Sequence, residues 1–252
     1  MKQIALFLFC LCTFGGTMQA QMACADPPAG MTNWWTADTK VRDYIGTGHA
    51  TARDGAGFGV GMVGQAFTFP GGLSRVDMPA SSFVQPTDKA TVDAWIYPTA
   101  HGNHGIYGLT VFSNTGTHGL AMRVYRGKLQ ADFRTPIGGT DPTTVLSGPV
   151  LALNAWSHVA ITYDGTAARS YVNGKLVGTR AQRGPIRDTD NAGTCPVIGN
   201  ENTGCVNQNI GYAFKGSIDE VGVFDRALDA SEILAIYEAG AAGKCRDRTR
   251  RE

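Results

Sequence analysis

The sequence predicts an all-β protein, a two-sheet antiparallel sandwich with one short helix near the C-terminus. Three observations lead to this fold class. At least nine short segments alternate apolar and polar residues or are rich in β-forming residues, which is the pattern of strands. The 33 glycines and 11 prolines lie mainly between these segments, where turns are expected. Helical periodicity occurs once, and no strand–helix–strand alternation is present, so the pattern does not suggest a parallel sheet.

The strand pattern runs through most of the chain after its first quarter. Two of the segments are long enough to hold two strands each, because a tight turn interrupts them at Arg126-Gly127-Lys128 and at Asn173-Gly174. The segments, in order, are 66–71, 74–79, 90–98, 108–114, 119–133, 156–164, 169–179 and 216–225.

The stretch SHVAITYDGTAARSYVNGKLVG, residues 157–178, is typical of a three-stranded meander. Val159, Ile161 and Tyr163 alternate with polar or small residues and share one face. The pairs Asp164-Gly165 and Asn173-Gly174 are strong hairpin-turn signals, because both residue types tolerate positive φ. We therefore predict that three consecutive strands form a meander, as part of one leaf of a sandwich.

The helix is predicted over about residues 230–239. Asp229 is a good N-cap, and Glu232 stands at the capping-box position three residues later. Leu228 can pack onto Ile233 as a hydrophobic staple, and Gly240 ends the helix.

Residues 1–20 are predicted to be a secretory signal peptide, cleaved after Ala20. Cleavage at the A-x-A motif Ala23-Cys24-Ala25 and attachment of a lipid to Cys24 are the alternatives. Lys2 supplies the positive charge, and residues 4–14 form an apolar run that is too short to span a bilayer as a permanent helix. One domain, 21–245, and a basic tail, 246–252, follow. No other segment is apolar enough to enter a membrane. The protein is therefore expected to be secreted, to the cell exterior or to the periplasm.

The charge balance predicts no electrostatic attraction to nucleic acid or to anionic membranes. The net charge is +1 and 17% of the residues are charged. A chain that binds nucleic acid or an anionic membrane through charge usually carries a clear excess of basic residues, which this chain lacks.

Four cysteines remain after removal of the signal peptide, and in an oxidising compartment an even number predicts disulfides. Three pairings are possible. We predict Cys195–Cys205, which closes a local loop, and Cys24–Cys245, which ties the two ends of the domain together. A zinc site is excluded because the chain has no CxxC pair.

The motifs WWTAD, ATVDAWIYP, WSHVAITYDGTAARSYVNGKLVG and FKGSIDEVGVFDRALDASEILAIYEAGAAGKC resemble, in order and spacing, the bacterial LamG-like jelly-roll domains of the concanavalin A-like lectin/glucanase superfamily. The resemblance covers about residues 24–245. It implies a jelly-roll sandwich and agrees with cysteines paired at the two ends. It also implies a glycan-binding, adhesive or accessory module, although one fold hosts many functions.

The same resemblance implies a Ca²⁺ ion at the edge of the sandwich. Asp219, in the strand that carries IDEV, is the predicted ligand, with Asp43 as a second one, because calcium prefers carboxylate and carbonyl oxygens. The alternative is that Asp219 accepts hydrogen bonds from backbone amides at a strand bulge.

Sugars are commonly bound by aromatic rings together with a few polar groups. In the segment 90–98, Val92, Ala94 and Ile96 share a face that is expected to be core, which leaves a polar and aromatic strip on the other face. A covering segment over Trp95 is the alternative. Trp34, Trp35 and Trp156 are expected in the core. The candidate ligand residues are Asp93, Trp95 and Tyr97 from the strip, and Tyr107 and Tyr125 near glycine-rich loops.

No catalytic residues are predicted. A retaining glycosidase needs two carboxylates about 5–5.5 Å apart. The adjacent Asp219 and Glu220 are expected to point to opposite faces of their strand, and no E-x-D-x-x-E motif is present. We therefore predict a non-catalytic domain that binds carbohydrate or a cell-surface protein. The alternatives are a structural surface or filament subunit and a divergent glycan hydrolase or lyase.

Overall fold

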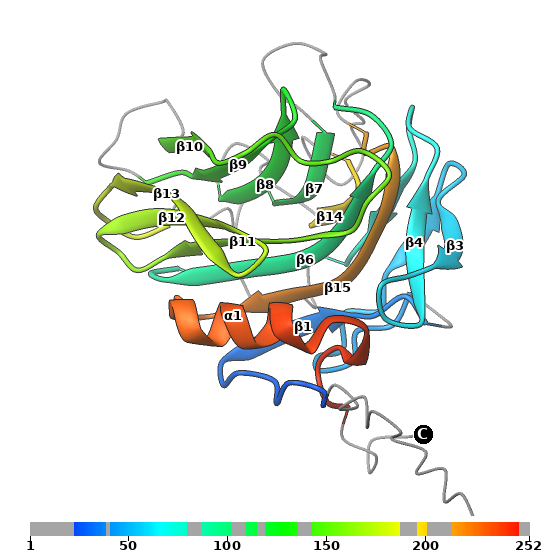
Figure 1. Cartoon of the computed structure of the whole chain (residues 1–252), viewed down its shortest axis with the longest axis horizontal. Coiled ribbons are helices and arrows are strands. Elements are labelled where there is room, and N and C mark those ends of the chain that lie inside the picture. The colour runs from blue at the N-terminus through cyan, green and yellow to red at the C-terminus, as the bar shows by residue number, and fades with distance from the viewer. Residues whose placement is uncertain are drawn as a thin grey trace, which may run out of the picture.

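Two antiparallel sheets stack face to face, and a helix packs on the outside of one of them (Figure 1). The computed structural model describes residues 23–38, 41–79, 87–101, 109–114, 119–135, 143–186, 196–200 and 213–246. The signal peptide, Tyr107, Cys195, Cys205 and most of the basic tail lie outside these ranges.

The large sheet holds eight of the described strands, in the order β13-β12-β11-β6-β15-β4-β3, with β1 also paired to β15. In Figure 1, β6 and β15 run through this sheet as two long neighbouring arcs. The strands are β1 (Met31–Trp35), β3 (Gly57–Val60), β4 (Gln65–Phe69), β6 (Ala90–Pro98), β11 (Ser157–Tyr163), β12 (Ala167–Val172), β13 (Lys175–Ala181) and β15 (Gly216–Phe224).

The small sheet holds seven described strands, in the order β10-β9-β8-β7-β14-β5-β2. All of its pairings are antiparallel, as predicted for a sandwich without helical crossovers. The strands are β2 (Thr51–Arg53), β5 (Arg75–Asp77), β7 (Leu109–Asn114), β8 (Leu120–Tyr125), β9 (Lys128–Phe133), β10 (Thr143–Ser147) and β14 (Val197–Ile198).

The predicted meander is confirmed, since β11, β12 and β13 pair in sequence order at one edge of the large sheet. Asn173 and Gly174 have φ values of 49° and 73°, so both residues adopt the positive φ that a type I′ turn requires. In the other turn, Asp164 accepts hydrogen bonds from the backbone amides of Thr166 and Ala167, both at 2.8 Å.

The core lies between the two sheets and follows the alternation of the sequence. Val92, Ala94 and Ile96 of β6 belong to it, as predicted. From the small sheet, β8 contributes Leu120, Met122 and Val124, and β9 contributes Leu129, Ala131 and Phe133. Burial of these apolar side chains is the main stabilising contribution to the fold.

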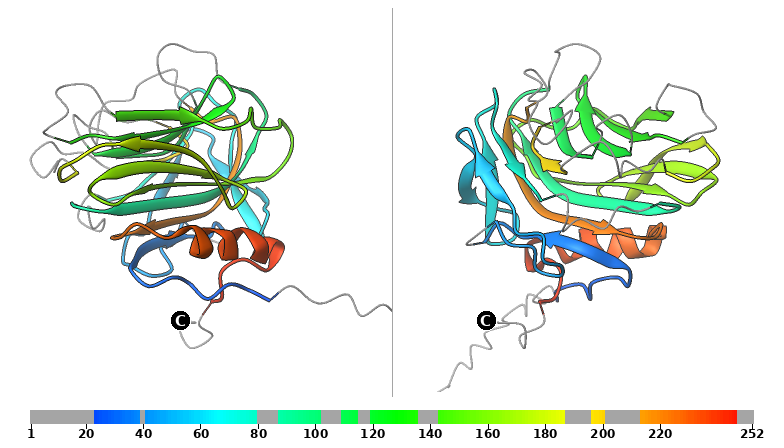
Figure 2. Two further views of the ribbon diagram at one scale, coloured as in Figure 1. Left: turned by 60° about the vertical axis from the view of Figure 1, so that its left-hand side comes forward. Right: turned by 180° about the vertical axis from the view of Figure 1, so that it is seen from behind.

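Helix α1 (Ala230–Ala239) is the one α-helix of the described residues, and the predicted capping box is present. The Asp229 side chain accepts from the Glu232 amide at 2.9 Å, and the Glu232 carboxylate accepts from the Asp229 amide at 3.0 Å. The helix lies along the outer face of the large sheet (Figure 2). Ile233 and Ile236 pack there in a second apolar cluster with Ala160, Tyr171, Phe224 and Leu228.

The two ends of the described chain meet on this outer side (Figure 2). Ala25 and Lys244 form a parallel bridge, in which the Ala25 amide donates to the Gly243 carbonyl at 2.9 Å and the Cys245 amide donates to the Ala25 carbonyl at 2.7 Å. Cys24 and Cys245 are joined by a disulfide, with their Cα atoms 4.9 Å apart. Among the described residues, no helix is long and apolar enough to cross a membrane.

Candidate functional site

The predicted strip on β6 is not an open surface. Trp95 is only 4% exposed, because the ring of Tyr237 from α1 lies 5.8 Å away and the ring of His158 lies 5.3 Å away. Asp93 is fully buried, and its Oδ2 lies 2.9 Å from Lys244 Nζ. The prediction that these two residues contact a ligand is therefore wrong, because the C-terminal helix and segment cover this part of the face.

Two other predicted ligand residues remain partly exposed. Tyr97 lies beyond the covered part of β6, and its ring centroid is 5.5 Å from that of Trp156. Trp156 is thus not a core residue, whereas Trp34 and Trp35 are fully buried. Tyr125 lies at the end of β8, under the Arg126 guanidinium at 5.2 Å.

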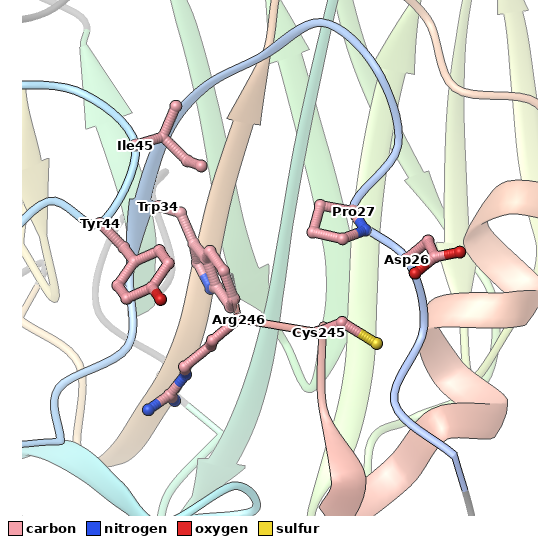
Figure 3. A pocket seen from close by; sticks show the side chains of 7 residues that line it. All are labelled: Asp26, Pro27, Trp34, Tyr44, Ile45, Cys245 and Arg246. Atoms are coloured by element: carbon pink, nitrogen blue, oxygen red, sulfur yellow. The ribbon is translucent and has the colours of Figure 1, made fainter. Parts of the chain in front are cut away.

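A pocket of about 340 Å³ opens where the two ends of the domain meet (Figure 3). Three parts of the chain build it: the segment after Cys24, strand β1 with the loop that follows, and the C-terminal segment. Figure 3 shows Tyr44, Trp34 and Arg246 close together, with Pro27 and Asp26 on the other side of Cys245. The lining residues are Asp26, Pro27, Trp34, Tyr44, Ile45, Cys245 and Arg246.

Asp43 shapes the loop that carries Tyr44 and Ile45 into this pocket. Its Oδ1 accepts hydrogen bonds from the amides of Trp34, Ile45 and Gly46 at 2.9, 3.1 and 3.0 Å. Its Oδ2 accepts from the side-chain amide of Asn33 at 2.6 Å and from the Gly48 amide at 3.3 Å. A buried carboxylate with five donors satisfies backbone groups that would otherwise lack partners, so Asp43 acts as an internal cap for the loop.

Trp34 lies fully buried behind the pocket and supports its lining. Its Nε1 donates to Glu220 Oε2 at 3.0 Å, and its ring meets Tyr44 edge to face at 5.0 Å. Lys244 Nζ and Arg246 Cζ lie 5.7 and 5.8 Å from the ring centroid, within reach of a cation–π contact. The orientation of the indole ring is therefore fixed from several directions.

Charged groups beneath the pocket neutralise one another. Arg246 pairs with Asp38 and lies 3.2 Å from Glu220 Oε1, while Lys244 Nζ donates to the Glu220 carbonyl at 3.1 Å. Burial raises the pKa of Glu220, although Lys244 and Arg246 partly oppose that rise. Burial would also raise the pKa of Asp93, but Lys244 and His158 outweigh it and hold that pKa below its usual value.

Asp219 and Glu220 do not point to opposite faces, as alternation predicted. Ile218 and Val221 both belong to the core, and the register of β15 against β6 shifts between Asp219 and Gly222. Glu220 has a φ of 55°. Such a bulge places two consecutive residues between core positions, so both carboxylates leave the core on the same side. Both are buried, at 0% and 1% exposure, and neither is open to a substrate.

The predicted pair Asp43 and Asp219 does not fit a calcium ion. All hydrogen-bonding capacity of the Asp43 oxygens is used by five N–H donors. Asp219 Oδ2 accepts from the Val63 amide at 2.9 Å, which is the alternative raised from the sequence, and Oδ1 has no hydrogen-bond partner among the described residues. Burial, then the charge of Glu220, raises the pKa of Asp219 to about 8. Within the described part of the chain, no three His, Cys, Asp or Glu side chains gather as a metal site.

The small sheet carries a polar cluster that was not predicted from the sequence. Arg123 of β8 and Gln130 and Asp132 of β9 lie on the face opposite the core, yet are 0%, 5% and 2% exposed. Arg123 pairs with Asp132, and the Gln130 amide nitrogen lies 3.3 Å from Asp132 Oδ1. The signal was present in GLAMRVYRGKLQADF, where these polar residues alternate with core positions.

Comparison with solved structures gives jelly-roll neighbours. One is domain 4 of AbnA, a GH43 extracellular arabinanase from Geobacillus stearothermophilus, in complex with arabinotriose, with a TM-score of 0.58 and 18% identity. The match covers 81% of this chain and 96% of that chain. Another is the CBM40 of the Ruminococcus gnavus IT-sialidase, bound to alpha2,3 sialyllactose, with a TM-score of 0.54 and 15% identity. The match covers 67% of this chain and 95% of that chain.

The binding domain of Paraclostridial Mosquitocidal Protein 1 is a third neighbour, with a TM-score of 0.65 and 15% identity. The match covers 82% of this chain but only 52% of that one. At these identities the likeness shows the fold alone. A search of curated proteins found no match to the sequence. A family model described as the concanavalin A-like lectin/glucanases superfamily matches residues 70–234, which is more than half of the chain. The chain therefore belongs to the concanavalin A-like lectin/glucanase superfamily.

Proposed function

We propose that this protein is a secreted, non-catalytic carbohydrate-binding domain, and that the pocket between its two ends holds a sugar residue. The observation that carries the proposal is the composition of that pocket. Its volume of about 340 Å³ lies within the range of small-molecule sites, about 300–1,000 Å³. The partly exposed ring of Tyr44 and the apolar side chains of Pro27 and Ile45 stand beside the Arg246 guanidinium and the Asp26 carboxylate. An aromatic ring with a few polar groups is the combination that suits the C–H faces and hydroxyl groups of a sugar.

The rigidity of the pocket supports binding. Tyr44 belongs to a loop whose conformation is fixed by the Asp43 carboxylate. This carboxylate accepts hydrogen bonds from three backbone amides of the loop, those of Ile45, Gly46 and Gly48. Arg246 follows a disulfide-bonded cysteine and pairs with two carboxylates. A preorganised site loses less conformational entropy when a ligand binds. The disulfide also supports secretion, because such bonds persist in oxidising compartments.

Isothermal titration calorimetry against arabinotriose, xylotriose, cellotriose and alpha2,3 sialyllactose tests the proposal. At least one sugar should bind, and Tyr44→Ala should weaken its affinity about 10-fold through loss of the aromatic contact. Phe58→Ala is the matched control, because Phe58 is an aromatic residue with 42% exposure on β3 and does not line the pocket. Its affinity should equal that of the native protein. Failure of every sugar to bind would exclude the function.

Two alternatives have their own readouts. A hydrolase or lyase would release new sugar ends during the same incubations, and we expect none, because Asp219 and Glu220 are buried. A filament subunit would assemble as its concentration rises. The edge strand β3 is the feature that favours assembly, because Val60 is 88% exposed there.

Calcium binding by Asp219 alone stays a prediction. The observation that supports it is the buried Oδ1 atom without a hydrogen-bond partner among the described residues. An ion that binds only the folded state raises the melting temperature. The native protein should therefore melt higher in millimolar calcium than in EDTA, and Asp219→Asn should abolish the difference. Identical native melting curves would end the calcium hypothesis.

A further inference from the structure

Four partly exposed side chains form a row across the outer face of the large sheet. Ser217 of β15 pairs with Tyr97 of β6 on one side and with Thr68 of β4 on the other. Trp156 directly precedes Ser157, which pairs with Ile96, so Trp156 stands beside Tyr97. Neighbouring strands lie about 4.8 Å apart, so the row from Trp156 to Thr68 extends about 14 Å across four strands.

The orientation of the row follows from the core. Ile96, Ile218, Phe67 and Phe69 all belong to the core, and each is adjacent in sequence to a member of the row. Because side chains alternate along a strand, the members of the row face outward. All four are partly exposed, whereas the next row along the strands, His158, Trp95 and Asp219, is buried. The part of the outer face that other segments bury thus ends between these two rows.

The chemistry of the row changes along its length. Trp156 and Tyr97 present two aromatic rings with centroids 5.5 Å apart, and Ser217 and Thr68 continue the line with two hydroxyl groups. Beyond Thr68 the line meets Gly57 of β3, where a Cβ would lie 3.3 Å from the Thr68 hydroxyl oxygen. The glycine leaves this hydroxyl open to a ligand.

We propose that this row is a second carbohydrate site, which binds a neutral oligosaccharide laid across the strands. Sugar rings would stack on Trp156 and Tyr97, and their hydroxyl groups would hydrogen-bond to Ser217 and Thr68. None of the four side chains is charged, so the site favours neutral sugars. A standard protein interface buries about 800 Å² on each partner. A single line of four side chains suits a narrow, linear ligand better. The inference rests on the proposed carbohydrate binding and adds a separate site.

The distribution of tryptophans makes the row directly observable. The chain has four tryptophans. Trp34, Trp35 and Trp95 are 0%, 0% and 4% exposed, whereas Trp156 is partly exposed. Acrylamide should therefore quench mainly Trp156, and Trp156→Phe should remove the quenchable part of the fluorescence. Arabinotriose, xylotriose, cellotriose and maltotriose are the probes. At least one should protect Trp156 from acrylamide in the native protein.

Variants of the hydroxyl end separate binding from folding. Thr68→Val and Ser217→Ala each remove one hydrogen bond and little volume, so each should weaken the affinity of the protecting sugar about 2- to 12-fold. Thr179→Val is the matched control, because Thr179 is an exposed strand threonine on β13, at the other edge of the large sheet. It should bind as the native protein does. Trp156→Ala should weaken binding about 10-fold. Thermal unfolding checks that each variant is folded.

The two sites fail in different ways. Protection of Trp156 that persists in Tyr44→Ala supports an independent second site. Suppose instead that a sugar binds, that Tyr44→Ala weakens its affinity about 10-fold, and that acrylamide quenches Trp156 equally with and without the sugar. The second site then does not exist and the pocket is the only carbohydrate site of the two. If none of the sugars binds the native protein at all, both proposals are wrong.

Discussion

Lys244 places its ammonium nitrogen 2.9 Å from the Asp93 carboxylate and so fastens the C-terminal segment to the middle of β6. Both side chains are 1% exposed. His158 Nε2 lies 3.2 Å from the same Asp93 oxygen. A residue at the end of the domain therefore completes a buried charge pair in the large sheet, directly beside the candidate pocket.

Substitution of Lys244 should markedly lower the denaturant concentration at the midpoint of unfolding. Lys244→Met keeps most of the side-chain volume but leaves Asp93 buried without its cation, which costs about 3–5 kcal/mol. Arg169→Met is the control. Its pair with Asp164 is 30% and 28% exposed, so the expected cost is only about 0–1 kcal/mol. Urea unfolding of both variants measures the difference, and equal midpoints would contradict the structural role of Lys244.

Acid should weaken the same contact. The pKa of Asp93 in the folded protein lies below its usual value of 3.8, because Lys244 and His158 outweigh the effect of burial. The unfolded chain therefore binds the proton more tightly than the folded chain. This contribution to stability is complete above about pH 4 and is lost as the pH falls through the folded pKa.

The measurement is the free energy of unfolding of the native protein and of Lys244→Gln between about pH 6 and pH 2. The variant should lose less stability over the acid part of this range, since it lacks the cation that lowers the pKa of Asp93. Parallel curves for the two proteins would show that the pair does not set the acid dependence.

The Cys24–Cys245 disulfide should contribute strongly to stability. It joins residues 221 positions apart, and in the chain-entropy model a loop of that length is stabilised by about 5 kcal/mol. Cys24→Ser/Cys245→Ser should lower the unfolding midpoint in oxidising buffer. A reducing agent should lower the native midpoint by a similar amount and leave that of the double variant nearly unchanged. An unchanged native midpoint after reduction would contradict the prediction.

The unreduced mature protein should contain no free thiol. Cys24 and Cys245 are bonded to each other, and the predicted Cys195–Cys205 pair lies outside the described residues. Alkylation of the denatured, unreduced protein followed by mass spectrometry should find no modified cysteine. Labelling of Cys195 and Cys205 alone would disprove the second disulfide and leave the terminal one intact.

Asp43 should be required for the pocket as well as for stability. Asp43→Ala leaves five N–H donors around a buried position without their acceptor, and even one such group costs about 1–3 kcal/mol. The variant should be destabilised by at least about 3 kcal/mol and should bind sugar at the pocket as weakly as Tyr44→Ala. Native affinity in Asp43→Ala would show that its loop is not part of the site.

The local pattern of the sequence determined most of the secondary structure. The Asn173-Gly174 turn, the Asp229–Glu232 capping box and the core face of β6 depend on residues close in the chain. Backbone preferences and side-chain alternation act over a few residues, so these features can be predicted from the local sequence.

Only the tertiary structure decided which outward-facing residues remain available to a ligand. Asp93, Trp95 and Tyr97 share one face of β6 in any alternating strand, yet Tyr237 and Lys244 cover the first two and leave the third open. The bulge that turns Asp219 and Glu220 to the same side likewise depends on pairing with β6. Alternation specifies which face of a strand a residue is on, whereas its burial depends on which distant segment packs over that face. The C-terminal segment that covers β6 lies about 150 residues further along the chain, so no local sequence pattern predicts this contact.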